Sequence, residues 1–499
     1  MHDGRRKQAR TPVRRTGVRR VIAVAGVLAL GAAGYALTGP VHTASAALSG
    51  GSAPGGAAHV WITTADGGKK LQRADDAAFD GTEQDIDISV DAGKKGQEFT
   101  GAGASMTESS AHLISGLPQD ERDALLKELF SRDGSGIGLT FLRQPLGASD
   151  FVAAKPFYSY EDEQGKFSVD RDTEEILPLL KQARSVNSGI RVMGTPWSAP
   201  GWMKDGGRLE GGSLKPEHYD DYAEYLVKAV QAYKKEGVPV DYLTAQNEPF
   251  FEGGYPSMKM TSAQQADFLK VLDSKLGAAG LDTELFAYDH NWDHPEYPLD
   301  VLAKTKDVKR VAGAAFHCYG GEPEAQQKVR DAGGRVLETE CSGTDADDSS
   351  QTFASTLKWQ TENLVIRSMR AGSETVVPWN LALDSKGGPQ YGNCGTKCNG
   401  VVEIGDGGDT VAKNAEFYVL GHVSKFVDRG AHRIASTTQG SGGLQNVTFE
   451  NPDGSRASVV LNASGSSKRF SLTENGKSLD YDLPAGAVAT FDWPGAPGN

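Results

Sequence analysis

The hydrophobic and polar positions at the two ends of the chain alternate with period two. Residues 59–66 (HVWITTAD) and 85–92 (DIDISVDA) show this alternation, which is typical of half-buried strands. Beyond residue 428 it returns in four stretches, LQNVTFEN, ASVVLNAS, KRFSLTEN and AVATFDW, with turns at Pro452-Asp453-Gly454 and Asn475-Gly476. We therefore expect an antiparallel β-sandwich that is built from both chain ends, residues 59–97 and 429–499.

Residues 98–428 follow a different pattern, in which short apolar runs alternate with helical stretches. The helical period is clearest at 215–237, where apolar side chains recur at i, i+3 and i+4 and Gly237 provides a C-terminal cap. The strand candidates are residues 99–106, 139–146, 191–197, 241–248, 284–291, 313–320, 335–341 and 375–383. Eight strands that alternate with helices predict an α/β fold, a (β/α)₈ TIM barrel.

A doubly wound open sheet is the alternative to a barrel. Such sheets often open with a Gly-x-Gly-x-x-Gly turn that binds a dinucleotide. Gly101-Ala102-Gly103 matches only half of that motif, and it does not open a helix. The pattern therefore favours the barrel.

The first 58 residues have the composition of a targeting segment and a linker. A basic stretch precedes the apolar run VIAVAGVLALGAAGYAL, and Ala44-Ser45-Ala46 fits a signal-peptidase site. We expect residues 1–46 to be a signal peptide and 47–58 a flexible linker. An uncleaved membrane anchor is the alternative, and Arg19-Arg20 permits twin-arginine export as well as the general route. A secreted, extracellular protein is expected.

Charge and cysteine content exclude several classes of partner. The signal segment carries eight Lys or Arg and one Asp, so its removal would move the formal net charge from −13 to −20. Such an acidic surface disfavours nucleic acids and anionic membranes. Cys394 and Cys398 are close enough in sequence to form a disulfide, whereas Cys318 and Cys341 are either buried thiols or a bond between neighbouring elements. The four cysteines do not have zinc-site spacing.

Polar and aromatic side chains gather at the C-terminal ends of the predicted barrel strands, where the active sites of such barrels lie. Two carboxylates, Glu248 and Glu340, end the fourth and seventh strands and can face one cavity. Glycoside hydrolysis requires such a pair, with one carboxyl as acid/base and one as nucleophile in retaining enzymes. Glu338 lies two residues before Glu340 and points to the same side of an ideal strand. It is therefore a rival nucleophile, although it lies deeper in the barrel. Other side chains at this rim are Arg143, Asp150, Trp197, Asn247, His317, Tyr319 and Trp379.

Several of these residues belong to motifs that resemble glycoside hydrolase family 30, which contains glucosylceramidases and endo-β-1,6-glucanases. The matching stretches are FTGAGASMTESSA, FLRQPLGASDF, GTPWSAPGWMK, TAQNEP, FHCYGG, ETECSG, PWNLALD with GGP, and EFYVLGHVSKFV. They cover the predicted barrel in order. The resemblance implies Glu248 as acid/base, Glu340 rather than Glu338 as nucleophile, and net retention of anomeric configuration.

The resemblance also implies a sugar subsite, no metal and no organic cofactor. Its matched lining residues are Asp150, Trp197, Asn247, His317, Tyr319 and Trp379, and Arg143 is a plausible donor to Glu340. We expect a monomer that hydrolyses a β-glucan or a glycolipid, with an endo-β-1,6-glucanase or a glucosylceramidase-like activity. The alternatives are another β-glycosidase of the family, such as a xylanase, and a non-catalytic carbohydrate-binding barrel. Both glutamates are present, which disfavours the latter.

Overall fold

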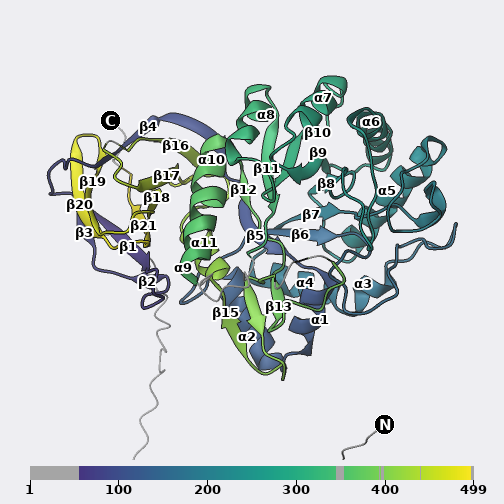
Figure 1. Cartoon of the computed structure of the whole chain (residues 1–499), viewed down its shortest axis with the longest axis horizontal. Coiled ribbons are helices and arrows are strands. Elements are labelled where there is room, and N and C mark those ends of the chain that lie inside the picture. The colour runs from purple at the N-terminus through teal and green to yellow at the C-terminus, as the bar shows by residue number, and fades with distance from the viewer. Residues whose placement is uncertain (1–55, 344–352, 393, 395–397, 439, 496–499) are drawn as a thin grey trace, which may run out of the picture. The chain divides into compact units, whose positions relative to one another are not determined.

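The structure is a computed structural model that describes residues 56–343, 353–392, 394, 398–438 and 440–495 (Figure 1). The expected signal peptide and nearly all of the expected linker lie outside these ranges. Among the helices of the described ranges, none has the length and apolar character needed to cross a membrane.

Eight parallel strands form the barrel: β5 (Gly101–Ser105), β6 (Phe141–Pro145), β7 (Arg191–Thr195), β8 (Tyr242–Thr244), β9 (Glu284–Asn291), β10 (Val311–His317), β11 (Arg335–Glu340) and β12 (Thr375–Val376). They pair in chain order, and β12 also pairs with β5. The ring closes between β11 and β12, where the Glu374 N–H donates to the Val336 carbonyl at 2.8 Å. This closed order confirms the barrel and rules out the doubly wound sheet.

Seven of the eight barrel strands are shorter than predicted, and β8 and β12 differ most. Strand β8 ends at Thr244 and β12 at Val376, so Glu248 and Trp379 lie beyond the strands rather than at their last positions. The backbone N–H of Glu248 donates to the Asp289 carbonyl at 3.0 Å, and the φ angle of Glu248 is +47°. That φ value is left-handed rather than extended, and Glu248 lies four residues beyond the end of β8.

Helices alternate with these strands. Helix α5 (Tyr219–Lys235) buries Tyr222, Tyr225, Leu226, Ala229 and Val230, the face that the sequence period predicts. The other α-helices are α1 (Glu108–Gly116), α2 (Gln119–Phe130), α3 (Asp170–Glu174), α4 (Ile176–Val186), α6 (Ser262–Ala278), α7 (Glu296–Lys304), α8 (Gln327–Asp331), α9 (Phe353–Gln360), α10 (Ser368–Ala371) and α11 (Ala415–Ser424). Short helical turns are η1 (Gly201–Met203), η2 (Pro216–His218) and η3 (Pro323–Gln326), and the π-helix η4 (Thr361–Arg367) joins α9 to α10.

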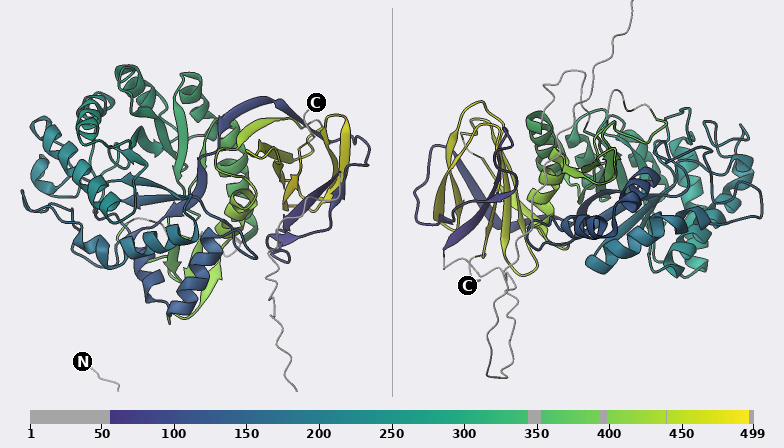
Figure 2. Two further views of the ribbon diagram at one scale, coloured as in Figure 1. Left: turned by 180° about the vertical axis from the view of Figure 1, so that it is seen from behind. Right: turned by 90° about the horizontal axis from the view of Figure 1, so that it is seen from below.

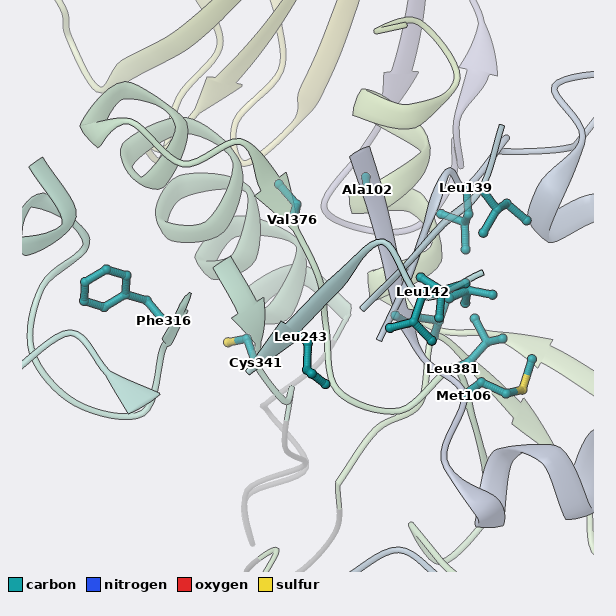
Figure 3. Close-up of a cluster of buried hydrophobic side chains, with 14 of the residues drawn as sticks. Ala102, Met106, Leu139, Leu142, Leu243, Phe316, Cys341, Val376 and Leu381 are labelled. Carbon is teal, nitrogen blue, oxygen red and sulfur yellow. The ribbon is translucent and has the colours of Figure 1, made fainter. Parts of the chain in front are cut away.

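The barrel strands separate two apolar layers. Figure 3 shows part of the larger cluster, in which Leu142, Leu243 and Val376 from three strands are buried. The smaller cluster includes Phe141 and Met193 and contains alternate residues of the same strands. Gly103 is required where β5 and β6 approach closely, because a Cβ there would lie 1.6 Å from the Phe141 carbonyl oxygen. This glycine therefore serves strand packing, not phosphate binding.

The second domain contains strands from both ends of the chain, as predicted (Figure 2). The short strands β2 (Gln72–Arg73) and β3 (Ala77–Ala78) pair with β1. The longer strands are β1 (Ala57–Thr63), β4 (Asp87–Glu98), β16 (His432–Ser436), β17 (Leu444–Glu450), β18 (Arg456–Asn462), β19 (Lys468–Glu474), β20 (Lys477–Leu483) and β21 (Val488–Trp493). Strand β1 pairs with β21, and β4 lies between β16 and β19. Strand β1 includes Ala57 and Ala58, the last two residues of the range expected for the linker.

Two further elements were not predicted. Strand β20 forms a hairpin with β19 through Asn475 and Gly476, whose φ angles of +52° and +75° suit a tight turn. A small sheet of β13 (Ala382–Asp384), β14 (Val402–Ile404) and β15 (Val411–Lys413) follows the last barrel strand. Its strands are three residues each, too short to show an alternating pattern in the sequence.

A buried histidine joins the barrel to the sandwich. The two ring nitrogens of His422, on α11, lie 2.9 Å from the Thr490 hydroxyl and 2.8 Å from the Thr63 hydroxyl. Thr490 donates its proton to the His422 carbonyl, and Thr63 accepts from the Leu71 N–H, so Nδ1 faces an acceptor and Nε2 faces a donor. This arrangement fits the neutral ring. Burial lowers the pKa of His422 to about 3.

We expect His422 to make the fold sensitive to acid. The pKa of histidine in the unfolded chain is about 6.5, so between pH 6.5 and 3 the unfolded state binds a proton that the folded state does not. The free energy of unfolding should therefore fall by about 1.4 kcal/mol for each pH unit through this window. Urea unfolding of the wild type and of His422→Gln at pH 7 and pH 4 measures the effect. An equal loss in both proteins would show that another group is responsible.

Candidate active site

Arg143, on β6, lies at the centre of the buried polar cluster at the C-terminal end of the barrel. Its Nη1 donates to Oε2 of Glu340 at 2.6 Å. Its Nη2 donates to Oδ1 of Asn247 and to Oδ2 of Asp289, both at 2.8 Å. The guanidinium is fully buried, so its two carboxylate partners, Glu340 and Asp289, are needed to offset its loss of hydration. Arg143 therefore fixes three rim segments around one point.

Asp289 is the second centre of this cluster. Besides Arg143, it accepts from the hydroxyls of Thr244 at 3.0 Å and Thr339 at 2.8 Å, and its Oδ1 lies 2.9 Å from Nε2 of His317. Tyr288 and Asp289 have positive φ angles, and the pairing of β9 with β10 shifts register at this point. Such a bulge redirects a side chain, and here it accompanies the inward position of the Asp289 carboxylate.

His317 connects Asp289 to Glu248. Its Nδ1 lies 3.0 Å from Oε1 of Glu248. Burial disfavours a charge on the ring, but Glu340 and Asp289 more than offset this effect and raise the pKa of His317 to about 10. The imidazolium form has a proton on each nitrogen, so it donates to Asp289 and to Glu248 at the same time.

Glu340 is the last residue of β11 and accepts two hydrogen bonds. One comes from Arg143, and the other from the Tyr319 hydroxyl to Oε1 at 3.0 Å. Asn247, which directs its carbonyl oxygen at Arg143, has its amide nitrogen on the opposite side as a donor. The structure thus brings Arg143, Asn247, Glu248, His317, Tyr319 and Glu340 into one hydrogen-bonded cluster.

Glu248 and Glu340 titrate as a coupled pair, because each charge affects the pKa of the other carboxyl. Burial raises the pKa of Glu340 against the charges of His317 and Arg143, and the charge of Glu248 raises it further. Burial would also raise the pKa of Glu248, but donation from His317 outweighs it and lowers that pKa. The two cations, Arg143 and His317, balance Asp289 and one further carboxylate. We therefore infer that Glu248 and Glu340 together hold one proton near neutral pH.

The predicted aromatic residues lie beside this cluster. The rings of Trp197 and Trp379 stack on each other with centroids 4.9 Å apart, and the Arg143 guanidinium lies 4.9 Å from Trp197 and 5.4 Å from Trp379. Both tryptophans are almost fully buried. Their faces are thus largely in contact with protein. Burial and the nearby Glu340 raise the pKa of Asp150 well above its usual value, so Asp150 also lies near the carboxyl pair.

Glu338 occupies a different environment from Glu340. Its Oε2 accepts from the Trp292 indole N–H at 2.9 Å, and its side chain is fully buried. Burial raises the pKa of Glu338 well above its usual value. No contact joins Glu338 to Arg143 or Tyr319 among the hydrogen bonds of the described residues. A carboxyl whose charged form is disfavoured by burial is a poor nucleophile, so this environment favours Glu340 over Glu338 for that role.

Sequence reasoning missed three residues of this site. Asp289 lies near the end of strand β9, and only the bulge there shows that it faces Arg143. His290 lies with Nδ1 3.6 Å from Oε1 of Glu248. Burial and the carboxyls of Asp150, Glu248 and Glu340 raise the pKa of Tyr255, so this phenol belongs to the site. Tyr255 follows Glu248 in a loop whose path has no sequence signature.

Glu248, His290 and His317 have the spacing of a metal site, with one potential ligand atom of each within 4.8 Å of the others. A metal-binding histidine must be neutral. Both nitrogens of His317 are engaged with carboxylates, and its raised pKa keeps both protonated. These residues therefore do not fit a metal ion at neutral pH.

Two disulfides border the site. Cys318 pairs with Cys341, and Cys394 pairs with Cys398. The Cys318–Cys341 bond shows that these two cysteines are paired and are not buried thiols. It joins the residue before Tyr319 to the residue after Glu340, so it links the ends of β10 and β11 directly.

Comparisons with known proteins agree with this geometry. The glycosyl hydrolase family 30 TIM-barrel domain matches residues 99–427, and the family 30 beta sandwich domain matches residues 430–491. Endo-1,6-beta-D-glucanase neg1 of Aspergillus fumigatus is 31% identical, over 83% of this chain and 89% of that protein. Lysosomal acid glucosylceramidase of Mus musculus is 29% identical, over 80% of this chain and 82% of that protein.

A solved structure gives the same result. The endo-beta1,6-glucanase BT3312 superimposes with a TM-score of 0.82 and 30% sequence identity, over 88% of this chain and 100% of that chain. Family models and relatives thus match the barrel, the sandwich and their order along the chain. The chain belongs to glycosyl hydrolase family 30, and it is a β-glycosidase.

Proposed function

We propose that the protein is a retaining endo-β-1,6-glucanase that acts by double displacement, with Glu340 as nucleophile and Glu248 as acid/base. One observation carries the assignment of roles. Glu340 accepts from both Arg143 and Tyr319, whereas Glu248 faces His317. Donation from Arg143 and Tyr319 favours the carboxylate form of Glu340, which a nucleophile needs. The acid role of Glu248 requires the proton of this coupled pair to lie on Glu248 when substrate is bound, although His317 lowers the pKa of Glu248 in the free protein.

In the first step, Oε of Glu340 attacks the anomeric carbon, and the bond to the leaving-group oxygen breaks as Glu248 protonates that oxygen. The Glu248 carboxylate that remains accepts a hydrogen bond from His317, which stabilises it. Asn247 presents its amide N–H₂ for a sugar hydroxyl. Arg143 donates to both Glu340 and Asn247 and so fixes their relative positions. The nucleophile and this donor therefore approach the same sugar ring.

In the second step, Glu248 removes a proton from water, and the water oxygen displaces Glu340 from the anomeric carbon. Glu340 is an uncharged ester in the intermediate, so it no longer repels a negative charge on Glu248. That change favours the ionised form of Glu248, which is the form that a general base needs. Two inversions give a product with the β configuration.

The choice of β-1,6-glucan is supported by relatives with that activity in their names, among them those from Aspergillus fumigatus and Trichoderma harzianum, which are 31% and 30% identical. The test is hydrolysis of β-1,6-glucan, β-1,3-glucan, glucuronoxylan and glucosylceramide by the protein, with product anomers followed by NMR. We expect β-1,6-glucan to be cleaved fastest and the β anomer to appear first. Initial release of the α anomer would refute the double displacement.

Glucosylceramide is the second candidate substrate. The support is the 29% identity to the murine lysosomal acid glucosylceramidase. The same screen separates the two, because turnover of glucosylceramide without turnover of β-1,6-glucan would select the glycolipid.

The pH dependence of kcat/KM should be bell-shaped. Protonation of Glu340 sets the acid limb, and because burial raises the pKa of Glu340, that limb should lie above the ordinary glutamate value of about 4.3. Loss of the one shared proton sets the basic limb. Glu248→Gln should remove the basic limb for an aryl glucoside that needs no acid. A basic limb that survives this substitution would assign the acid to another group.

We further propose that the enzyme is exported and acts outside the cell as a monomer. The support is the basic and apolar composition of residues 1–46 and the small residues at its end. Expression of the full chain in a bacterium with fractionation tests this. The expected product lacks residues 1–46 and lies outside the cytoplasm, and an uncleaved protein in the membrane fraction would contradict the proposal.

A further inference from the structure

A cavity of about 500 Å³ shares a wall with the active site. Tyr319 and Ser342 line this cavity. The Tyr319 hydroxyl donates to Glu340 at 3.0 Å and lies 3.3 Å from the Ser342 hydroxyl, so one face of this wall contacts the nucleophile. The Cys318–Cys341 disulfide fixes the positions of both wall residues. The cavity volume lies within the range of about 300–1,000 Å³ that ligand sites occupy.

Another wall of the cavity contains an exposed tryptophan. Trp359, on α9, lines the cavity and is 43% exposed. Five large hydrophobic side chains are exposed in the part of the chain that the structure describes: Val186, Phe250, Tyr319, Trp359 and Tyr391. The four aromatic ones follow strands β8, β10, β11 and β13, and none belongs to the sandwich. Exposed aromatic rings thus concentrate on the barrel, the domain that holds the active site. Flat apolar rings there can bind the apolar face of a sugar.

The rest of the lining is polar. Thr356, Lys358 and Gln360 surround the tryptophan, together with Ser342 from the shared wall. A hydrocarbon chain would need a continuous apolar surface, because burying hydroxyl and amine groups against it is costly. A sugar ring has an apolar face that can lie on an indole and hydroxyls at its edge that can bond to such polar groups. The lining therefore offers the aromatic face and the hydrogen-bonding groups that a sugar ring requires.

We propose that this cavity binds a further glucosyl unit of the β-glucan chain, adjacent to the unit that reacts, with Trp359 as the stacking surface. The inference rests on the proposed function and deepens it, because it assigns a second subsite to a polymeric substrate.

The test compares Trp359→Ala with Trp359→Phe, which keeps a flat ring. For each protein, kcat/KM is measured on a β-1,6-linked glucotetraose and on an aryl β-glucoside. We expect Trp359→Ala to lower the ratio of kcat/KM on the tetraose to kcat/KM on the aryl β-glucoside about tenfold, the effect of losing one aromatic contact. Trp359→Phe should restore most of this ratio. Val186→Ala, on helix α4, is the surface control, and thermal unfolding checks that each variant is folded.

Each outcome separates this inference from the proposed function. Selective loss with the tetraose supports the subsite. Equal changes on both substrates, in a wild type that hydrolyses β-1,6-glucan, would overturn the subsite and leave the proposed function standing. A wild type that does not hydrolyse β-1,6-glucan would overturn both. Titration of the tetraose into Glu340→Gln with and without Trp359→Ala provides a readout without turnover, and an unchanged Kd would refute the stacking role.

Discussion

Replacing Glu340 by Gln should lower kcat by roughly four to six orders of magnitude, as expected for loss of a nucleophile. The amide keeps an oxygen that can accept from Arg143 and Tyr319, but its low nucleophilicity prevents formation of the glycosyl-enzyme ester. The measurement is steady-state hydrolysis of an aryl β-glucoside and of β-1,6-glucan, with thermal unfolding to confirm that the variant is folded.

Glu338→Gln is the matched control for this prediction. Glu338 lies two residues earlier on the same strand, in an enclosed site that raises its pKa well above the usual value, so an amide of the same shape should preserve most of the activity. Near wild-type activity in Glu340→Gln, or a comparable loss in Glu338→Gln without loss of folding, would mean that the nucleophile has been assigned wrongly.

Replacing Glu248 by Ala should lower kcat on β-1,6-glucan by roughly two to four orders of magnitude, the scale of general acid–base catalysis. A sugar alkoxide is a poor leaving group and needs the proton. An aryl glucoside with a nitrophenolate leaving group does not, so its first step should survive and the second step should become limiting. The measurement is the ratio of kcat on the two substrates, with a burst of nitrophenol as a second sign.

Added azide distinguishes Glu248 from Glu340. In Glu248→Ala, azide can attack the glycosyl-enzyme ester without a general base, which restores turnover and yields the β-glucosyl azide. In Glu340→Ala, azide can only take the place of the nucleophile and would yield the α-glucosyl azide. The α product from Glu248→Ala would reverse the two assignments.

Much of the fold was predictable because the sequence periods match the structure. The eight barrel strands and helix α5 have apolar positions that follow strand and helix periods directly. The N-terminal strands could be assigned to the sandwich because the barrel had no place for them. The small sheet β13–β15 could not, because three-residue strands are too short for a period to appear.

The position of a site residue was predictable where that residue lies at or just after a strand end, in a motif with several polar or aromatic side chains. Glu248, Glu340 and His317 are in this class. Asp289 and Tyr255 required the structure, because the first depends on a bulge with two positive φ angles and the second on the path of a loop. The stacking of Trp197 on Trp379 also depends on packing across the barrel, and it shows that these rings are more enclosed than their predicted role as open sugar platforms implies.

The central claim is that Glu340 forms a covalent bond to the sugar. A 2-deoxy-2-fluoro-β-glucoside with a good leaving group tests it directly, because the fluorine slows both steps while the leaving group restores the first. Mass spectrometry of the protein should show the addition of one fluoroglucosyl group, and peptide mapping should place it on Glu340. A label on Glu338 or on any other residue, or turnover of the reagent with no labelled protein and release of the α anomer, would contradict the account.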